Sequence, residues 1–212
     1  MEVYRTITEP VLFELTEKRS RFIAALSPAE NEEQAQKFIE SVRKQHHEAR
    51  HHCFAFLTRQ GNITRCSDDG EPSGTAGQPI LNVLEGAELT DVCCVVTRYF
   101  GGTLLGTGGL TRAYGGAAAG AVAGAAVRQF TECVLCLVHM DYSFYGKFCK
   151  LCEKFPLLQD RGEFSDEVTV AAAVRADRFD AFCAAVTELT AGTAQIAEQG
   201  RDFRILPEIG EV

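Results

Sequence analysis

The sequence has no apolar run long enough to cross a membrane. Its longest, around residues 117–127, is too short and too rich in glycine for a transmembrane helix. The chain does not open with a charged segment followed by an apolar one, so we expect no secretory signal. Nine cysteines, an odd number with several inside apolar runs, then predict free thiols in a reducing compartment. The predicted localisation is cytoplasmic, with no membrane partner.

Two common catalytic signatures are missing as well. No Gly-Lys-Ser/Thr follows the glycine-rich loop, so the chain lacks a Walker phosphate loop. No Gly-x-Ser-x-Gly elbow supports Ser67 or Ser73 as a nucleophile beside a histidine and Asp68 or Asp69. These absences favour a binding protein over an enzyme and predict no cofactor.

Positive charge is scarce overall and unevenly spread. The 212 residues carry a net charge of −8, which disfavours broad non-specific attraction to nucleic acid or anionic membranes. Residues 1–131 hold 13 Lys and Arg against 15 Asp and Glu, whereas residues 132–212 hold 8 against 14. A local basic patch is therefore compatible with the first part, while the second part is expected to repel phosphate.

The segment from Val92 to Val127 organises the first part of the chain. We expect a buried strand over residues 92–97, a glycine-rich loop over 98–108 and a helix over 109–128. Thr107 is the expected helix cap, and Arg98 and Arg112 flank the loop, which together suggest an anion site at a helix start. The alternative is that the glycines only permit tight turning and close packing.

Four glycines fall inside this predicted helix, at positions 115, 116, 120 and 124. Each costs about 0.8–1 kcal/mol relative to alanine, or roughly 3–4 kcal/mol together. We therefore expect another backbone to pack very close to this helix and offset that cost.

An acidic loop precedes this segment, with Asp68, Asp69 and Glu71 crowded between Ser67 and Pro72. Its carboxylates could bind a hard cation, act in acid–base chemistry, or pair with Arg65, Arg98 and Arg112. Because structural carboxylates are commoner than catalytic ones, we favour a mutual lock with the arginines. The lock would build one mixed-charge surface.

Histidine and cysteine clusters offer candidate metal ligands, but their contexts argue against metal. His46, His47, His51 and His52 lie at a helix end and a strand start, so they need not converge. Two Cys-x-x-Cys pairs have zinc-ribbon spacing but lie in a predicted strand and an amphipathic helix rather than on glycine-containing knuckles. The four thiols, Cys133, Cys136, Cys149 and Cys152, are predicted core residues, and no metal site is predicted.

The remaining patterns predict an α+β chain of two domains, residues 1–131 and 132–212. In the first, strands are expected over 11–26, 51–58 and 63–66. A helix is expected from a capping box at Ser27-Pro28-Ala29-Glu30 to His46, and another through Ile80 to Leu84. The second reads as strand, helix 144–155, strand, strand 167–174, helix 177–189 and strand 194–203. That order is the ferredoxin-like βαββαβ pattern.

Three stretches carry a family resemblance: KRSRFIA at 18–24, RCSDDGEPSGTAGQPIL at 65–81 and VVTRYFGGTLLGTGGLTRAYGGAA at 95–118. They resemble the IMPACT family, in particular its bacterial YigZ-type members. The resemblance implies an N-terminal domain similar to domain 2 of a small-subunit ribosomal protein and a C-terminal domain similar to a ferredoxin-like domain of elongation factor G. It also implies a link to translation, because eukaryotic relatives dampen a starvation-response kinase by competing for its ribosome-associated activator.

The leading hypothesis is a non-enzymatic, translation-associated regulator that contacts RNA, the ribosome or a translation-associated protein. One alternative is an enzyme that binds a phosphorylated small molecule or nucleotide at the glycine-rich loop, with the acidic loop as metal ligand or base. Another is a purely protein-binding module that uses the acidic C-terminal domain. Lys18 and His52 are outer candidates for the functional surface. Its expected members are Arg65, Ser67, Asp68, Asp69, Glu71, Arg98, Tyr99, Gly101, Gly102, Thr107, Gly108, Gly109, Arg112 and Tyr114.

Overall fold

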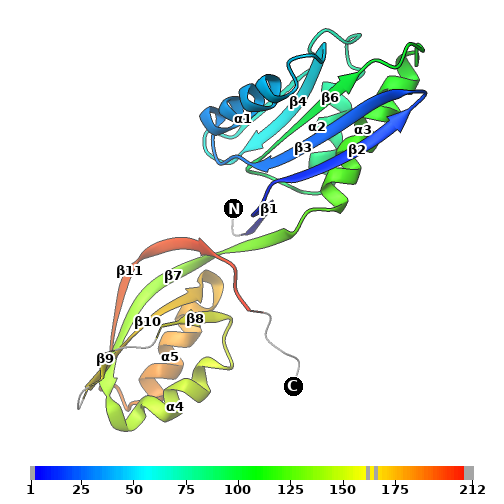
Figure 1. The fold of residues 1–212 in the computed structure, drawn as a ribbon. Helices are drawn as coiled ribbons and strands as arrows, with labels where there is room; N and C mark the ends of the chain where they lie inside the picture. The colour runs from blue at the N-terminus through cyan, green and yellow to red at the C-terminus, as the bar shows by residue number, and fades with distance from the viewer. Residues whose placement is uncertain (1–2, 161–162, 165–166, 208–212) are drawn as a thin grey trace. The chain divides into compact units, whose positions relative to one another are not determined.

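A computed structural model describes residues 3–160, 163–164 and 167–207. The chain divides into two units, one formed by Tyr4–Arg128 and the other by Met1–Val3 with Gln129–Val212. Both combine helices with antiparallel sheets, which confirms the α+β class and the two-domain architecture (Figure 1). No helix within the described ranges is long and apolar enough to cross a membrane.

The first unit is a five-stranded antiparallel sheet with helices on both faces (Figure 1). The strand order is β2-β3-β6-β4-β5, and β1 (Val3–Ile7) lies outside this sheet. The sheet strands are β2 (Val11–Glu17), β3 (Ser20–Pro28), β4 (His51–Thr58), β5 (Ile63–Ser67) and β6 (Val92–Tyr99). The helices are α1 (Glu32–Gln45), α2 (Gly77–Gly86) and α3 (Thr107–Ala123).

The central strand β6 is buried along nearly its whole length, as its unbroken apolar run predicts. Cys94 and Val96 face α2 and α3 in the larger core, while Cys93 and Val95 face α1 in a smaller core. Because successive side chains of β6 point to opposite faces of the sheet, this strand contributes to both cores. Arg98 is the next residue of β6, after Cys94 and Val96, whose side chain lies on the face covered by α2 and α3.

The second unit has the ferredoxin-like order β7 (Val127–Asp141), α4 (Tyr142–Cys152), β8 (Leu157–Gln159), β10 (Glu167–Arg175), α5 (Phe179–Leu189) and β11 (Gln195–Arg204). Its strands are ordered β11-β7-β10-β8, with β9 (Glu163–Phe164) also paired to β10. Phe148 of α4 and Phe182 of α5 meet edge to face in its core. The predicted βαββαβ pattern is confirmed.

Several predicted boundaries are wrong. Helix α1 begins at Glu32 with Asn31 as its cap, because Ser27 and Pro28 still pair within the sheet. Helix α3 begins at Thr107 rather than 109 and ends at Ala123 rather than 128, with Gly106 in the cap position predicted for Thr107. Strand β6 extends through Tyr99, so the loop that follows is shorter than predicted.

The α3 glycines are packed mostly against side chains. A side chain at Gly120 would overlap the ring of Phe13, whereas Gly116 meets Leu15 at ordinary contact distance and Gly115 meets Pro79. Gly124 is the C-cap of the helix. An aromatic ring from β2 therefore fills the space that Gly120 leaves, whereas the backbone of Pro79 lies close to Gly115, so the predicted backbone packing is found at Gly115 and not at Gly120.

Candidate functional site

Antiparallel pairing brings distant residues to one end of the first unit's sheet. Arg98 of β6 lies opposite Phe22 of β3 on one side and opposite His51 of β4 on the other. The β2–β3 turn, the loop after Ser67 and the loop before α3 surround this row. We call this end the tip and define it as residues 17–22, 43–52, 67–74 and 98–112.

A buried ion pair lies at the tip's centre. The Arg98 Nη1 atom donates to Glu71 Oε1 at 2.6 Å, and the two side chains are only 7% and 4% exposed. Tyr114 of α3 donates its hydroxyl to the same oxygen at 2.8 Å. The predicted lock between the acidic loop and an arginine thus exists for Arg98, and Tyr114 joins it.

One donor of this network has no partner. Arg98 Nε is buried and forms no hydrogen bond among the described residues. Its guanidinium lies 5.5 Å from the ring centres of both Phe22 and Phe100. An unsatisfied buried donor on a charged group costs about 1–3 kcal/mol or more. The presence of such a donor at Arg98 therefore calls for an explanation.

Asp68 holds the start of α2 in place. Its carboxylate accepts hydrogen bonds from the backbone N–H groups of Gly74, Ala76 and Gly77 at 2.8–2.9 Å. Burial raises the pKa of this carboxyl, but the three donors outweigh burial and bring the pKa below its ordinary value. Both Asp68 oxygens are engaged, which leaves them poorly suited to bind a cation.

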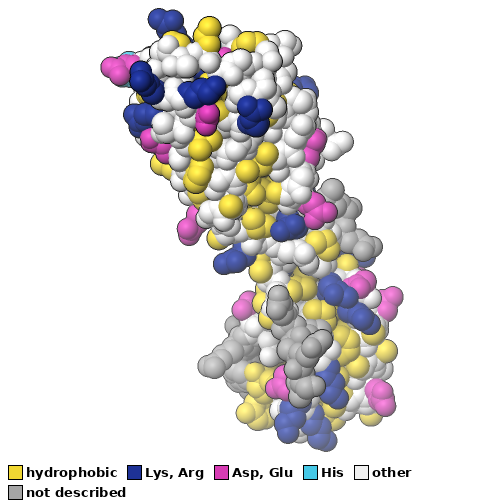
Figure 2. All heavy atoms as spheres, turned by 90° about the vertical axis from the view of Figure 1, so that its right-hand side faces the viewer, with side chains coloured by type: hydrophobic (Ala, Val, Ile, Leu, Met, Phe, Trp, Pro, Cys, Tyr) yellow, Lys and Arg dark blue, Asp and Glu magenta, His cyan; other side chains and the backbone are white. Residues whose placement is uncertain are grey.

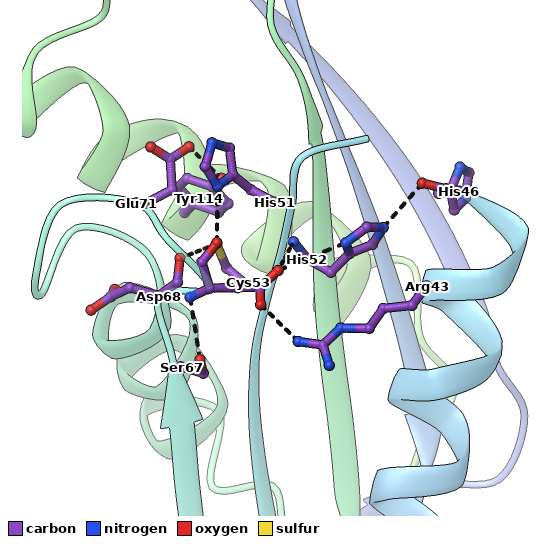
Figure 3. Close-up of polar contacts among 10 residues, drawn as sticks. Arg43, His46, His51, His52, Cys53, Ser67, Asp68, Glu71 and Tyr114 are labelled. Atoms are coloured by element: carbon purple, nitrogen blue, oxygen red, sulfur yellow. Dashed lines mark hydrogen bonds and ion pairs between the residues drawn. The ribbon is translucent and has the colours of Figure 1, made fainter. Parts of the chain in front are cut away.

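Asp69 ties the acidic loop to β4 and α1. Its partners Arg43 and His52 are labelled in Figure 3. Its carboxylate accepts from Arg43 at 2.7 Å and from the backbone N–H of His52 at 2.7 Å, while its carbonyl lies 2.9 Å from His51 Nδ1. Arg43 was absent from the predicted surface. Helical spacing alone could not reveal it, because its partner is 26 residues away.

The histidines act as structural links in this part of the chain. His46 Nδ1 lies 3.0 Å from the Tyr99 hydroxyl, and His52 Nε2 lies 3.1 Å from the carbonyl of His46. The pKa of His46 lies below its ordinary value, chiefly because the ring is partly buried and also because His52 and Arg21 are nearby. His46 and His52 thus fasten α1, β4 and β6 together, while His51 ties β4 to the acidic loop.

The β2–β3 turn is formed by two basic residues in the left-handed conformation. Glu17 pairs with Ser20, so Lys18 and Arg19 form a two-residue hairpin turn, with φ values of 44° and 69°. Such turns normally take Asn-Gly because L side chains disfavour positive φ. Residues held in sparsely populated backbone conformations cluster at functional sites.

Gly101 lets the loop after β6 approach this turn. A side chain there would overlap the Arg19 carbonyl group and the Ser20 nitrogen, and the Gly101 N–H donates to Ser20 Oγ at 3.1 Å. Gly102 follows with φ of 81°. The glycine-rich loop is therefore partly explained by close backbone packing, the less specific of the two interpretations of its glycines.

The start of α3 is exposed, with Thr107 and Gly108 facing solvent and Gly109 partly buried. Arg112 is exposed in the first turns and forms no ion pair among the described residues, so the predicted lock through Arg112 is wrong. Arg65 lies opposite Phe56, away from the tip, and donates to the carbonyl of Thr64. It is not brought to the site.

The cysteines are buried to different degrees. Cys53 lies beneath the acidic loop and donates its thiol to the Asp68 carbonyl at 2.9 Å, and burial raises its pKa to about 12. Cys133, Cys136 and Cys152 are buried in the second unit, while Cys149 is only partly buried. No group of three or more His, Cys, Asp or Glu in the described ranges is arranged to bind a metal ion.

Charge at the tip contrasts with that of the whole chain. The tip holds eight Lys and Arg against five Asp and Glu, in a chain of net charge −8, and also four of the five histidines. Figure 2 shows Lys and Arg side chains gathered at this end of the first unit, with hydrophobic side chains among them. Phe100 and Leu104 are exposed by 56% and 84%.

Known proteins are similar to this chain in sequence. Residues 18–122 match the family model of the Impact N-terminal domain, and residues 138–193 match a domain of unknown function designated DUF1949. The chain is 38% identical over 196 residues to the IMPACT family member YvyE of Bacillus subtilis, covering 92% of this chain and 90% of the relative. The chain belongs to the IMPACT family.

Further comparisons extend this assignment. The IMPACT family member YigZ of Escherichia coli is 46% identical over 119 residues, 55% of this chain and 58% of that protein. A solved structure described as a hypothetical protein is similar with a TM-score of 0.61 and 33% identity, covering 93% of this chain and 97% of that one. The IMPACT family also includes eukaryotic proteins named IMPACT, among them one from Bos taurus that is 33% identical over 98 residues.

Proposed function

We propose that this IMPACT family member is a non-enzymatic, cytoplasmic binding protein that acts on translation. Its tip would contact RNA, a ribosomal component or a translation-associated protein. The observation that carries the proposal is the tip itself, where exposed cations and the exposed Phe100 ring stand on a base held together by hydrogen bonds and ion pairs. Such a base fixes the positions of the contacting groups before a partner arrives.

The exposed cations of the tip come from several elements. Lys18 and Arg19 occupy the hairpin turn, Arg50 precedes β4, and Arg112 lies in α3. Arg21 is paired with Glu14 through a two-point contact but remains exposed, so solvent screens that pair. A surface of this kind attracts phosphate-rich partners locally even though the whole chain is acidic.

The rival hypothesis of an enzyme receives less support. Catalysis by the acidic loop would need a carboxylate free to bind a metal or take a proton. The Glu71 carboxylate already accepts hydrogen bonds from Arg98 and Tyr114. The Asp68 carboxylate accepts from three backbone N–H groups, and the Asp69 carboxylate accepts from Arg43 and the backbone N–H of His52. Thermal-shift measurements with nucleotides and Mg²⁺ test this rival directly. A ligand at about 100 times its Kd should stabilise a true enzyme site by about 2.7 kcal/mol.

Affinity purification from a cell lysate, with and without RNase, tests the proposed function. The tagged full-length protein should retain ribosomal components or tRNA. The double variant Arg19→Glu/Arg112→Glu should lose them. A matched control, Lys147→Glu/Lys150→Glu, makes the same charge change on exposed positions of the second unit and should behave as the wild type.

Three results of this purification decide between the hypotheses. Partners that resist RNase and depend on the acidic second unit would favour the purely protein-binding module. Absence of any ribosomal or tRNA partner from the wild type would contradict the proposed function. Equal retention by the two double variants would contradict the role assigned to the tip.

A further inference from the structure

The Arg98 guanidinium has one edge without a partner. Its Nη1 atom binds Glu71, while the buried Nε atom has no hydrogen-bond partner within the described part of the chain. Nε and Nη2 form the side edge of a guanidinium, which suits two oxygens of a carboxylate or phosphate at once.

In two other arginines of the chain, the same side edge binds a carboxylate. Arg21 binds both oxygens of Glu14 through Nε and Nη2, at 2.9 Å each. Arg175 binds Asp177 in the same way, at 2.5 and 2.7 Å. Arg98 is far more buried than either, so water is less able to satisfy its Nε, yet the described residues supply no acceptor for it.

Two phenyl rings flank this guanidinium. Phe22 is fully buried, whereas Phe100 is 56% exposed, and each ring centre lies 5.5 Å from Arg98 Cζ. Phe100 is thus a solvent-facing aromatic side chain in direct contact with a buried cation. Exposed aromatic rings beside backbone-binding cations are the elements with which proteins hold single-stranded nucleic acid.

We propose that the side edge of Arg98 binds a phosphodiester of single-stranded RNA when the exposed Phe100 ring turns aside to admit it, and that a neighbouring base stacks on that ring. The inference rests on the proposed function and names the partner of the tip. Phosphate is favoured over carboxylate because Lys18, Arg19 and Arg21 lie on the strands and turn next to Arg98. A single strand is favoured over a duplex because only unpaired bases expose their faces for stacking.

Free phosphate or a mononucleotide could supply the same chemistry, and the two sources make different predictions. A small phosphorylated ligand would fill the Arg98 edge with little need for Phe100. A single strand would need both groups, because the base contributes through the ring and the phosphate through the guanidinium.

Fluorescence anisotropy with a labelled 12-nucleotide RNA, the matching duplex, and AMP or inorganic phosphate as competitors separates these cases. The full-length protein should bind the single strand more tightly than the duplex. Phe100→Ala should weaken single-strand binding about 5- to 150-fold. Phe100→Trp should retain binding, and Tyr142→Ala, which removes another exposed aromatic ring, should leave it unchanged.

The Arg98 contact has its own readout, which avoids relying on a variant that may not fold. The Nε–H signal of Arg98 in ¹⁵N NMR spectra, assigned with Arg98→Lys or by sequential methods, should shift on addition of the single strand. If inorganic phosphate or AMP shifts it equally and Phe100→Ala binds RNA normally, a small-molecule site replaces the proposed one.

Failure of this inference differs from failure of the proposed function. If RNA or ribosomes bind through the tip but neither the Arg98 signal nor Phe100→Ala responds, the inference is wrong and the proposed function stands. If no single-stranded RNA binds and no ribosomal or tRNA partner is retained from lysate, both are wrong.

Discussion

Arg98 and Glu71, 27 residues apart, form an ion pair from which solvent is almost entirely excluded, with a nitrogen–oxygen distance of 2.6 Å. Burying both charges is costly, and their attraction offsets the cost only while both partners are present. The pair fixes the acidic loop against the end of β6, so it determines how the tip presents its exposed residues.

Removing one charge of this pair should be strongly destabilising. Glu71→Gln leaves the Arg98 guanidinium buried without its counter-charge, and we expect a loss of about 3–5 kcal/mol in the free energy of unfolding. Urea denaturation measures the change. Glu14→Gln breaks the exposed pair with Arg21 and serves as the control, with an unchanged midpoint expected. Similar midpoints for the two variants would mean that the buried pair is not important for stability.

The hairpin turn should show a trade-off between stability and binding. Lys18→Asn/Arg19→Gly places the residues preferred at positive φ and should stabilise the protein by about 1–2 kcal/mol. The same variant removes two cations and should weaken binding to ribosomes or RNA. Ala191→Gly relieves a similar left-handed residue in the second unit and should leave binding intact. Unimpaired binding by the turn variant would rule out a role for these cations.

Gly101 should tolerate no side chain. In Gly101→Ala the new methyl group meets the backbone of Arg19 and Ser20, so the hairpin or the loop must move, and we expect a loss of about 2–3 kcal/mol. Gly108→Ala is the control, because its nearest neighbour is the flexible Arg112 side chain at 3.6 Å. That change should be neutral or stabilise α3 by up to about 1 kcal/mol. Thermal unfolding of both variants gives the comparison.

Asp68 should make stability sensitive to acid. Because its pKa is lower in the folded protein than in the unfolded chain, its contribution is present above the unfolded value, about pH 3.9, and is lost as the pH falls through the folded value. Asp68→Asn should lower stability at pH 7 and flatten the decline in stability that sets in as the pH falls towards the ordinary pKa of about 3.9. An unchanged slope in Asp68→Asn would show that its three hydrogen bonds do not control the pKa.

Periodicity and apolar content were sufficient to predict most elements of the fold. The run at Val92–Val96 identified the central strand, and the order of elements after Thr131 identified the ferredoxin-like unit. The start of α1 was missed because Ser27-Pro28 fits a capping box equally well, and only pairing with β6 shows that it belongs to a strand. Local patterns cannot reveal that Pro28 pairs with Val92, 64 residues further along the chain.

The sequence predicted which residues belong to the site better than it predicted which of them contact one another. The family resemblance and the charge pattern both selected Arg98 and Glu71, which do meet. Arg112 and Arg65 share the same chemistry but lie where no acidic side chain reaches them among the described residues. Arg43 and Phe100 were missed, because their importance comes from packing between elements rather than from any motif.

Co-sedimentation with ribosomes through a sucrose gradient, at several salt concentrations, tests the central claim most directly. The account predicts that the wild type co-sediments, that binding falls steeply as salt rises, and that Arg19→Glu/Arg112→Glu weakens binding and reduces the salt dependence. The Lys147→Glu/Lys150→Glu control should match the wild type. Absence of the wild type from ribosomal fractions and from RNA at every salt concentration, or equal binding by the tip variant, would contradict the account.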